Sequence, residues 1–380
     1  MPVSSPNTLR VLIVSQYGFP PRCRNMNAYQ RVLHTSDWCE VHLLIRSRED
    51  ISDELLAKVH LHRAPVHNRW LFLAYSVFLA LYLRMRGCSF LFTDPSGFAA
   101  VGFVAQLLFG YTWVLDVWDR PRWRTGEHEA HSRPPISDRL VFALMRRARV
   151  YLLSVLPQAA KDIPPDPQRS LQLYNAIDLS TVAATPLTRG AAEDPTLHLA
   201  YGRSQFWETM ALDVVMEAAA VLVAAKVPFK VHLVGQVSEA DRQRILHSPV
   251  AENFVVHGFI AKSRIEFFRS IHAGLVPYMD FEDLRYIFPI KVLEHLSQGN
   301  PVIASDLPGL TSMVQHEVNG LLVKPGCAKS LAAAIHRLQQ DTSLFNSLSR
   351  GALSSIHKYD VKAKHREIFH HLARLASSRA

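Results

Sequence analysis

The sequence predicts an α/β protein of two domains, each built on a doubly wound, mostly parallel sheet. Short runs of Val, Ile, Leu and Phe, typical of strands buried on both faces, alternate with longer helical segments. This alternation occurs twice, on either side of a stretch rich in Pro, Thr, Ala and Gly at 179–195. The length of 380 residues also exceeds what one typical hydrophobic core organises.

The first half begins with a buried strand at 10–14, RVLIV, followed by a polar loop at 15–21. Further strands are expected at 40–46, 60–64, 90–93, 112–117, 150–155 and 171–178, with helices at 27–35, 51–59, 70–85, 98–109 and 137–147. Binding residues gather in loops beyond the carboxyl ends of such strands. The arginine-rich loop DVWDRPRWRTGEHEAH at 116–131 is therefore a candidate binding loop, and a solvated connection is the alternative.

The second half repeats the scheme. Strands are expected at 197–201, 230–234, 254–258, 273–277, 301–304 and 320–323, with helices at 208–225, 238–247, 263–270, 327–340, 342–358 and 361–378. The expected domains are an N-terminal domain at 1–180 and a C-terminal domain at 181–360. The segment 361–380 is expected to be a helix that packs back towards the N-terminal domain.

Composition narrows the classes of partner. A formal net charge of +9 and a pI near 9.5 favour an acidic partner. Because there is no zinc finger, RNP-type pattern or Lys/Arg block, nucleic acid is not expected. The four cysteines lack CxxC spacing, which indicates a reducing compartment and no structural metal. The short polar start shows no signal peptide, so a cytoplasmic protein is expected, with the inner face of the membrane as a more specific location.

An uncharged segment at 70–83, WLFLAYSVFLALYL, lies between Arg69 and Arg84. It is shorter than the roughly 20 residues needed to span a bilayer. A buried helix is the preferred interpretation. The alternative is peripheral contact with an anionic membrane, through a helix that lies on the membrane surface.

The stretch 280–309 carries the clearest candidate site. A helix begins near Pro289 and Gly299 is placed to end it in a left-handed conformation. Lys291 and Glu294 are three residues apart, so they lie on roughly one face near the start of this helix. A helix N-terminus with a lysine suits a phosphate, and a glutamate accepts hydrogen bonds from sugar hydroxyls. The alternative is a surface ion pair.

Several motifs in order give the chain a family resemblance. They are the RVLIVS strand, YNAID at 174–178, AYGR at 200–203, VHLVGQ at 231–236, HGFI at 257–260 and PIKVLEHLSQGNPVIASDLPG at 289–309. In this order they resemble the motifs of the retaining GT-B glycosyltransferases of family GT4, and the likeness covers nearly the whole chain. It implies two Rossmann-like domains facing a central cleft, with a nucleotide-diphosphate sugar in the C-terminal domain and the acceptor in the N-terminal domain.

The resemblance also implies roles for individual residues. Glu294 would bind the ribose, Arg203 the diphosphate, and Lys291 would add a second phosphate contact. The loop at Gly18 would approach the sugar and phosphate, and residues 257–260 would meet the base. The expected catalytic residues are Arg203, Lys291 and Glu282; the expected donor-binding residues are Gly18, Gly202, Arg203, Gly235, His257, Phe259, Ile260, Tyr286, Lys291, Val292 and Glu294; the expected acceptor-binding residues are Asp116, Trp118, Asp119 and Arg120.

Three positions depart from the family pattern. Tyr286 stands where the family has an acid, and Glu282 or Asp283 nearby would have to substitute. The family's lysine after Gly-Arg has no match, and Lys291 would compensate for its charge. Trp118, before Asp119, stands in place of a histidine.

The implied reaction moves a sugar from a nucleotide-diphosphate sugar to a glycan or lipid-linked acceptor with retention of anomeric configuration. It needs no metal and no cofactor, because the leaving phosphate accepts the acceptor's proton. The alternatives are a catalytically inactive nucleotide-sugar-binding partner of another transferase, or a sugar-nucleotide epimerase with the same GT-B fold.

Overall fold

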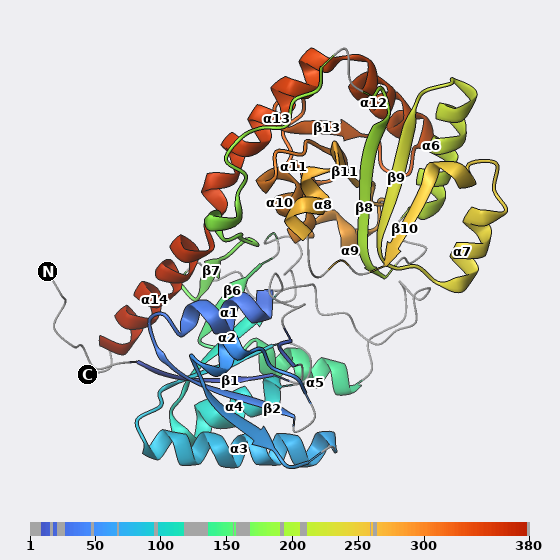
Figure 1. The fold of residues 1–380 in the computed structure, drawn as a ribbon. Helices are drawn as coiled ribbons and strands as arrows, with labels where there is room; N and C mark the ends of the chain where they lie inside the picture. Colours follow the sequence, from blue (N-terminus) through green and yellow to red (C-terminus); the bar gives the residue numbers. More distant parts are fainter. Residues whose placement is uncertain are drawn as a thin grey trace, which may run out of the picture. The chain divides into compact units, whose positions relative to one another are not determined.

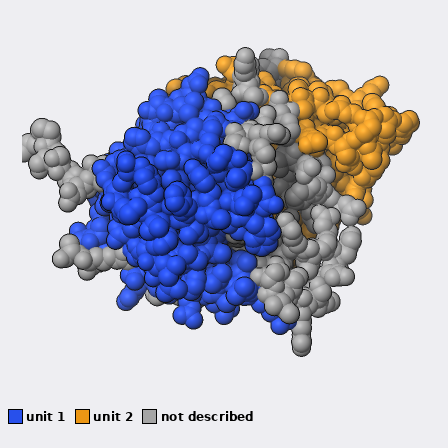
Figure 2. Space-filling view, turned by 90° about the horizontal axis from the view of Figure 1, so that it is seen from below, with its two compact units in different colours: residues 1–174, 361–380 blue, residues 175–360 orange. Residues whose placement is uncertain are grey.

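The computed structural model of the chain divides into two compact units, coloured separately in Figure 2. Unit 1 comprises residues 1–174 and 361–380, and unit 2 comprises residues 175–360. The structure describes residues 9–15, 18–20, 27–46, 49–66, 68–94, 98–117, 136–154, 156, 168–190, 194–205, 211–258, 260 and 264–377. The chain thus passes between units at 174–175 and 360–361, where the sequence placed domain boundaries at 180–181 and 360–361.

The described part of unit 1 contains a seven-stranded parallel sheet of order β3-β2-β1-β4-β5-β6-β7 (Figure 1). Its strands are β1 (Arg10–Val14), β2 (Glu40–Arg46), β3 (His60–Ala64), β4 (Phe90–Thr93), β5 (Thr112–Val117), β6 (Val150–Leu153) and β7 (Ser170–Gln172). Every residue of β4, β5 and β6 is buried, because helices cover both faces of the sheet.

Successive side chains of each strand serve opposite faces of this sheet. On one face Val11 and Ile13 pack in a core with residues of α1 (Asn27–Thr35), α2 (Asp53–Leu56) and α14 (Val361–Ser377). On the other face Leu12 and Val14 pack in a core with residues of α3 (Arg69–Met85) and α4 (Ala99–Phe109). The helix α5 (Ile136–Met145) joins β5 to β6.

Unit 2 is organised in the same way. Its described residues form a six-stranded parallel sheet of order β10-β9-β8-β11-β12-β13. The strands are β8 (Leu197–Gln205), β9 (Phe229–Gln236), β10 (Phe254–Gly258), β11 (Ala273–Val276), β12 (Val302–Ser305) and β13 (Gly320–Val323). The helices are α6 (Leu212–Ala224), α7 (Glu239–Leu246), α8 (Arg264–Arg269), α9 (Glu282–Arg285), α10 (Ile290–Ser297), α11 (Pro308–Thr311), α12 (Ala328–Gln340) and α13 (Thr342–Ile356).

The predicted fold class, two doubly wound α/β domains, is confirmed. Gly299 has the expected positive φ, 78°, after the end of α10. Two expectations are wrong in detail. The helix expected at 51–59 is one turn at 53–56, and the helix expected to be buried at 70–85 exposes one side, with Trp70 74% and Phe78 65% exposed. Only one face of that helix meets the sheet.

A row of four histidines crosses the sheet of unit 2. His232 lies between two others, with Nε2 2.9 Å from His198 Nδ1 and Nδ1 2.8 Å from His257 Nε2. The backbone N–H of His198 donates to His272 Nδ1 over 2.9 Å. Burial lowers the pKa of all four imidazoles, and the pKa values of His232 and His272 fall to about 4. The folded row is therefore held neutral.

Acidification from pH 7 to 4.5 is expected to destabilise unit 2. An unfolded histidine binds a proton near pH 6.5, whereas folded His232 and His272 resist protonation until about pH 4, so stability is lost as pH falls through this window. Urea unfolding at several pH values measures this. His232→Gln should reduce the pH dependence, whereas substitution of His357, which is exposed just after α13 in the same unit, should leave it intact. An equal pH dependence for the native and His232→Gln proteins would contradict the expectation.

Candidate active site

The helix that carries Lys291 and Glu294 is held tightly against the sheet of unit 2. Gly274 of β11 lies under the ring of His295, and a Cβ built on Gly274 would lie 2.3 Å from His295 Cδ2. His295 is 2% exposed and also packs edge-on against Phe268, with ring centroids 4.8 Å apart. A glycine in β11 therefore allows α10 to approach the sheet closely, and this contact sets the height of Lys291 and Glu294 above the strands.

Gly274→Ala is expected to lower the stability of unit 2 by about 1–3 kcal/mol, because the new methyl group overpacks the His295 ring. Urea unfolding of the full chain measures the change. Gly202→Ala is the matched control, because its added Cβ would have ordinary contacts of 3.8 Å and longer. Equal stabilities of the two variants would show that α10 is not positioned by this contact.

Two of the predicted donor-binding positions, Gly202 and Lys291, come together above the sheet, and a third, Gly235, lies on the neighbouring strand. Gly202 of β8 pairs in register with Val234 of β9, the neighbour of Gly235. A Cβ built on Gly202 would lie 3.8 Å from both Cδ and Nζ of Lys291, so the half-buried lysine extends over this part of β8. Gly235 has a φ of 128°, which favours glycine. A lysine ammonium beside a position without a side chain suits a phosphate.

Glu294 lies one helical turn beyond Lys291 and is 4% exposed. Its neighbours Val292, Leu293 and Leu296 are fully buried, which seats this side of α10 in the core. The side chain of Val292, a predicted donor contact, accordingly has no exposed surface. A carboxylate in such surroundings stays charged only while hydrogen-bond donors surround it, and this favours a role as an acceptor of hydrogen bonds.

The acidic segment before α10 forms the short helix α9. Glu282 is exposed at its first residue, and Tyr286 is half-buried just after its last. Arg285 Nε and Nη2 bond the carboxylate of Asp280 over 2.5 and 2.8 Å, and this ion pair lowers the pKa of Asp280. Glu282 is exposed on α9, whereas Glu294 is buried in α10. The two carboxylates therefore have different environments.

The remaining C-terminal candidates are less informative. His257 lies at the exposed end of the histidine row, and Ile260 is half-buried. The structure describes the backbone of Arg203 in β8 but not its side chain. Phe259 and the acceptor candidates Trp118, Asp119 and Arg120 lie outside the described residues.

Gly18, expected to approach the donor, packs closely against residues of its own unit. A Cβ at Gly18 would lie 2.5 Å from the carbonyl oxygen of Asp50, and the N–H of Gly18 donates to Glu49 Oε2 over 3.0 Å. The next residue, Phe19, pairs with Ile51 in a parallel bridge. Glycine is needed here for close packing against the 49–51 backbone, and its N–H is already engaged.

Asp116, predicted to bind the acceptor, forms a buried ion pair. Arg31 Nε lies 2.7 Å from Asp116 Oδ2, and Arg31 Nη2 lies 3.1 Å from Oδ1. The two side chains are 7% and 4% exposed. The two hydrogen bonds join α1 to the carboxyl-terminal end of β5. Asp116 therefore contributes to the structure of unit 1, because its carboxylate pairs with the buried guanidinium of Arg31.

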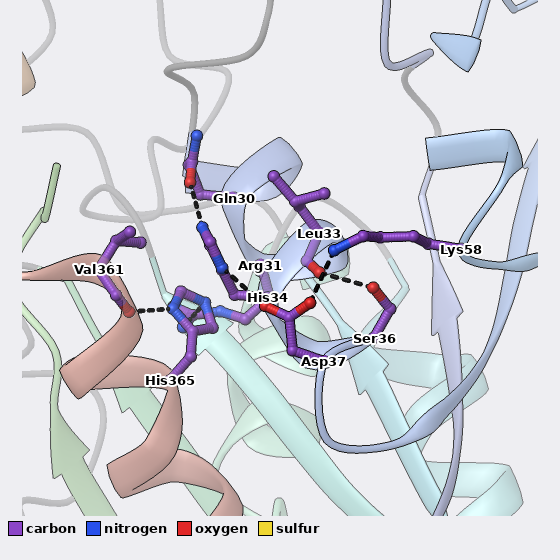
Figure 3. Close-up of polar contacts among 9 residues, drawn as sticks. All are labelled: Gln30, Arg31, Leu33, His34, Ser36, Asp37, Lys58, Val361 and His365. Atoms are coloured by element: carbon purple, nitrogen blue, oxygen red, sulfur yellow. Dashed lines mark hydrogen bonds and ion pairs between the residues drawn. The ribbon is translucent and has the colours of Figure 1, made fainter. Parts of the chain in front are cut away.

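The same arginine also meets α14. Arg31 Nη1 lies 3.3 Å from His365 Nε2, and His365 Nδ1 lies 2.8 Å from the carbonyl oxygen of Val361 (Figure 3). Burial and the nearby Arg31 guanidinium hold the pKa of His365 well below its ordinary value. The neutral ring therefore donates from Nδ1 to Val361 and accepts from Arg31 at Nε2. His34, which bonds Gln30 and Asp37 in the same view, packs against the His365 ring.

This ion pair borders a pocket in unit 1, at the carboxyl ends of β1, β4 and β5. Its polar lining includes Ser15, Arg31, Thr93, Asp94 and Asp116. Sequence reasoning found Asp116 but missed Arg31, His365 and Asp94. The sequence does contain a signal for His365. It lies at helical spacing from Val361, Ile368 and Leu372, and all four residues are buried, so this spacing places His365 on the core face of α14. Within the described part of the chain, no group of three or more His, Cys, Asp or Glu side chains is arranged to hold a metal ion.

Comparison with known proteins finds a family match within unit 2. Residues 196–341 match the family of glycosyl transferases group 1. Across the whole chain, the fold resembles that of HepE from Anabaena, solved with UDP and glucose, with a TM-score of 0.73 at 16% identity over 96% of this chain and 100% of that one. The chain thus has the two Rossmann-like domains of the GT-B fold, and its C-terminal unit contains the segment that is similar to glycosyl transferases group 1.

Two curated relatives extend the likeness along the sequence. Trehalose phosphorylase of Pleurotus pulmonarius is 25% identical over 322 residues, which are 82% of this chain and 38% of that protein. D-inositol 3-phosphate glycosyltransferase of Geodermatophilus obscurus is 27% identical over 256 residues, 62% of this chain and 53% of that protein. The chain therefore spans about two fifths to one half of the length of these relatives.

Proposed function

We propose that this protein is a glycosyltransferase that moves a hexose from a nucleotide-diphosphate sugar to a glycan or lipid-linked acceptor. The observation that carries the proposal is the position of Lys291 over Gly202, inside the segment that matches glycosyl transferases group 1. The HepE neighbour binds UDP and glucose, and one curated relative is named as a glycosyltransferase. Both support a nucleotide sugar as donor.

The proposed division of labour follows from the chemistry of the side chains. Lys291 and Arg203 stabilise the charge that grows on the leaving diphosphate, and Glu294 accepts hydrogen bonds from the ribose. The pocket bordered by Asp94 and Asp116 in unit 1 is the proposed place for acceptor hydroxyls. Retention of configuration, independence of metal and the absence of a cofactor belong to the proposal, which takes them from the motif resemblance. We place the reaction in the cytoplasm, at the inner face of the membrane for a lipid-linked acceptor.

The test begins with a thermal-shift screen of nucleotide sugars against the full chain. The donor that stabilises most is then assayed for transfer, with and without a chelator, and the anomeric configuration of the product is read by NMR. Transfer with retained configuration in the presence of chelator is the expected result. Tight donor binding with neither transfer nor hydrolysis across a panel of glycan and lipid-linked acceptors would overturn it in favour of an inactive binding partner. Conversion of the donor sugar without an acceptor would identify an epimerase.

A further inference from the structure

The outer side of α3 is apolar along its whole length. Ala74, between Trp70 and Phe78, is exposed like both of them, and the row continues through Leu81, Tyr82 and Met85. Trp70, Phe78 and Met85 are 74%, 65% and 75% exposed. The intervals of three and four residues place them on one helical face, which we name the α3 face: Trp70, Phe78, Leu81, Tyr82 and Met85. Figure 2 views the molecule from the side on which α3 lies in Figure 1.

The opposite side of the same helix is already used by the fold. Phe72, Ser76, Leu79 and Leu83 are buried, and the apolar ones pack in the core beneath the sheet of unit 1. A helix on the surface of a soluble domain normally turns polar residues to water on its outer side. The α3 face instead exposes apolar side chains to water. These side chains do not pack in the core, so core packing does not explain why they are apolar.

The neighbouring helix adds to this exposed apolar surface. Leu107 and Leu108 of α4 are each 67% exposed. The two helices are joined near these residues, because Arg84 Nε donates to the carbonyl oxygen of Phe109 over 2.7 Å. Tyr111 Oη donates to the carbonyl oxygen of Ala80 over 2.8 Å, which fixes the end of α4 beside the middle of α3.

Every charged residue within α3 and α4 is an arginine. Neither α3 nor α4 contains an acidic residue, whereas Arg69 begins α3 and Arg86 follows it. The guanidinium of Arg86 lies over the Tyr82 ring, 4.6 Å from its centroid. Arg146, Arg147 and Arg149 are exposed after α5, and Gln106 of α4 donates to the carbonyl oxygen of Arg147 over 2.9 Å. An apolar strip bordered by arginines is complementary to a surface that is apolar inside and anionic outside.

We propose that the α3 face, with Leu107 and Leu108, binds an anionic lipid bilayer. A helix of 17 residues is about 25 Å long, and none of the described helices has the length and composition needed to cross a membrane. α3 would therefore lie in the plane of the interface, with Phe78 and Met85 among the acyl chains. Trp70 and Tyr82 suit the headgroup level, and the arginines meet the lipid phosphates.

The test is flotation of the full chain with phosphatidylcholine vesicles, with and without phosphatidylglycerol. The protein is expected to float with the anionic vesicles at low salt, less well at high salt, and little with the neutral vesicles. Phe78→Glu combined with Met85→Glu should reduce binding at least tenfold without unfolding the protein, because both side chains are exposed. Leu246→Glu in unit 2, at a side chain 61% exposed, is the matched control and should bind as the native chain does.

Three outcomes would overturn the proposal. The first is a native protein that does not float with the vesicles, and the second is a double variant that floats equally well. The third is a dimer, seen by light scattering, that the same double variant dissociates, because a second copy of the chain would then cover the α3 face. Binding of a soluble nucleotide sugar should be unchanged in the double variant, so failure here is distinguishable from failure of the proposed transferase activity.

Discussion

Asp116→Ala is expected to lower the free energy of unfolding of unit 1 by about 3–5 kcal/mol, because it leaves the Arg31 guanidinium buried without its carboxylate. Arg31 would retain its contact with neutral His365, which carries no compensating charge. Urea unfolding followed by tryptophan fluorescence measures the change, since Trp113 is fully buried in β5.

Two further variants separate the buried charge from a general effect of truncation. Adding Arg31→Leu to Asp116→Ala should restore much of the lost stability, because no buried charge then remains unpaired. Lys58→Ala removes one of the two side-chain partners of Asp37, in an ion pair whose side chains are 41% and 35% exposed, and should change stability by about 1 kcal/mol or less. An Asp116→Ala protein as stable as the Lys58→Ala protein would contradict the argument.

Glu294→Gln is expected to raise the dissociation constant of the nucleotide about 10- to 100-fold. The substitution keeps the shape of this 4% exposed side chain but replaces a charged acceptor by a neutral amide. A hydrogen bond to a charged group contributes roughly 1.5–3 kcal/mol, which corresponds to this range. Calorimetry on the full chain, with the nucleotide that binds best and UDP as the first probe, measures the effect.

Glu239→Gln supplies the matched control for that change. Glu239 begins α7 in the same unit and bonds the side chain of Gln243 at the exposed surface, so its loss should leave nucleotide affinity unchanged. If Glu294→Gln binds nucleotide as tightly as the native chain, Glu294 is not a ribose ligand. A folded Glu294→Gln protein, checked by circular dichroism, excludes loss of structure as the cause of weaker binding.

Much of the fold was predictable because strands buried on both faces have a distinctive composition. β1, β2, β4 and β5 were predicted at their observed bounds, since runs such as RVLIV and FLFT suit only a central parallel strand. The helix α9 was not predicted, because a single turn has no apolar period to detect. The exposure of α3 was also mispredicted: an apolar sequence does not say which side a neighbouring layer covers.

The sites were predictable only where the residues lie in one continuous stretch. Lys291 and Glu294 share a helix, so their relation follows from helical geometry alone. Arg31, Asp116 and His365 lie on α1, β5 and α14, and only the tertiary fold brings them together. The pocket they border was not visible from sequence for the same reason. The contact of Gly202 with Lys291 likewise depends on how α10 lies over the sheet.

The return of α14 to unit 1 has a consequence for the order in which the chain acquires structure. Unit 2 is continuous, from 175 to 360, so all of its strands are available before α14 leaves the ribosome. Unit 1 lacks His365, Ile368 and Leu372 from its interior until that moment. During synthesis the first domain to be translated is thus the last to be completed. A chain truncated after residue 360 should therefore contain a protease-resistant unit 2 beside a unit 1 that is still readily cleaved.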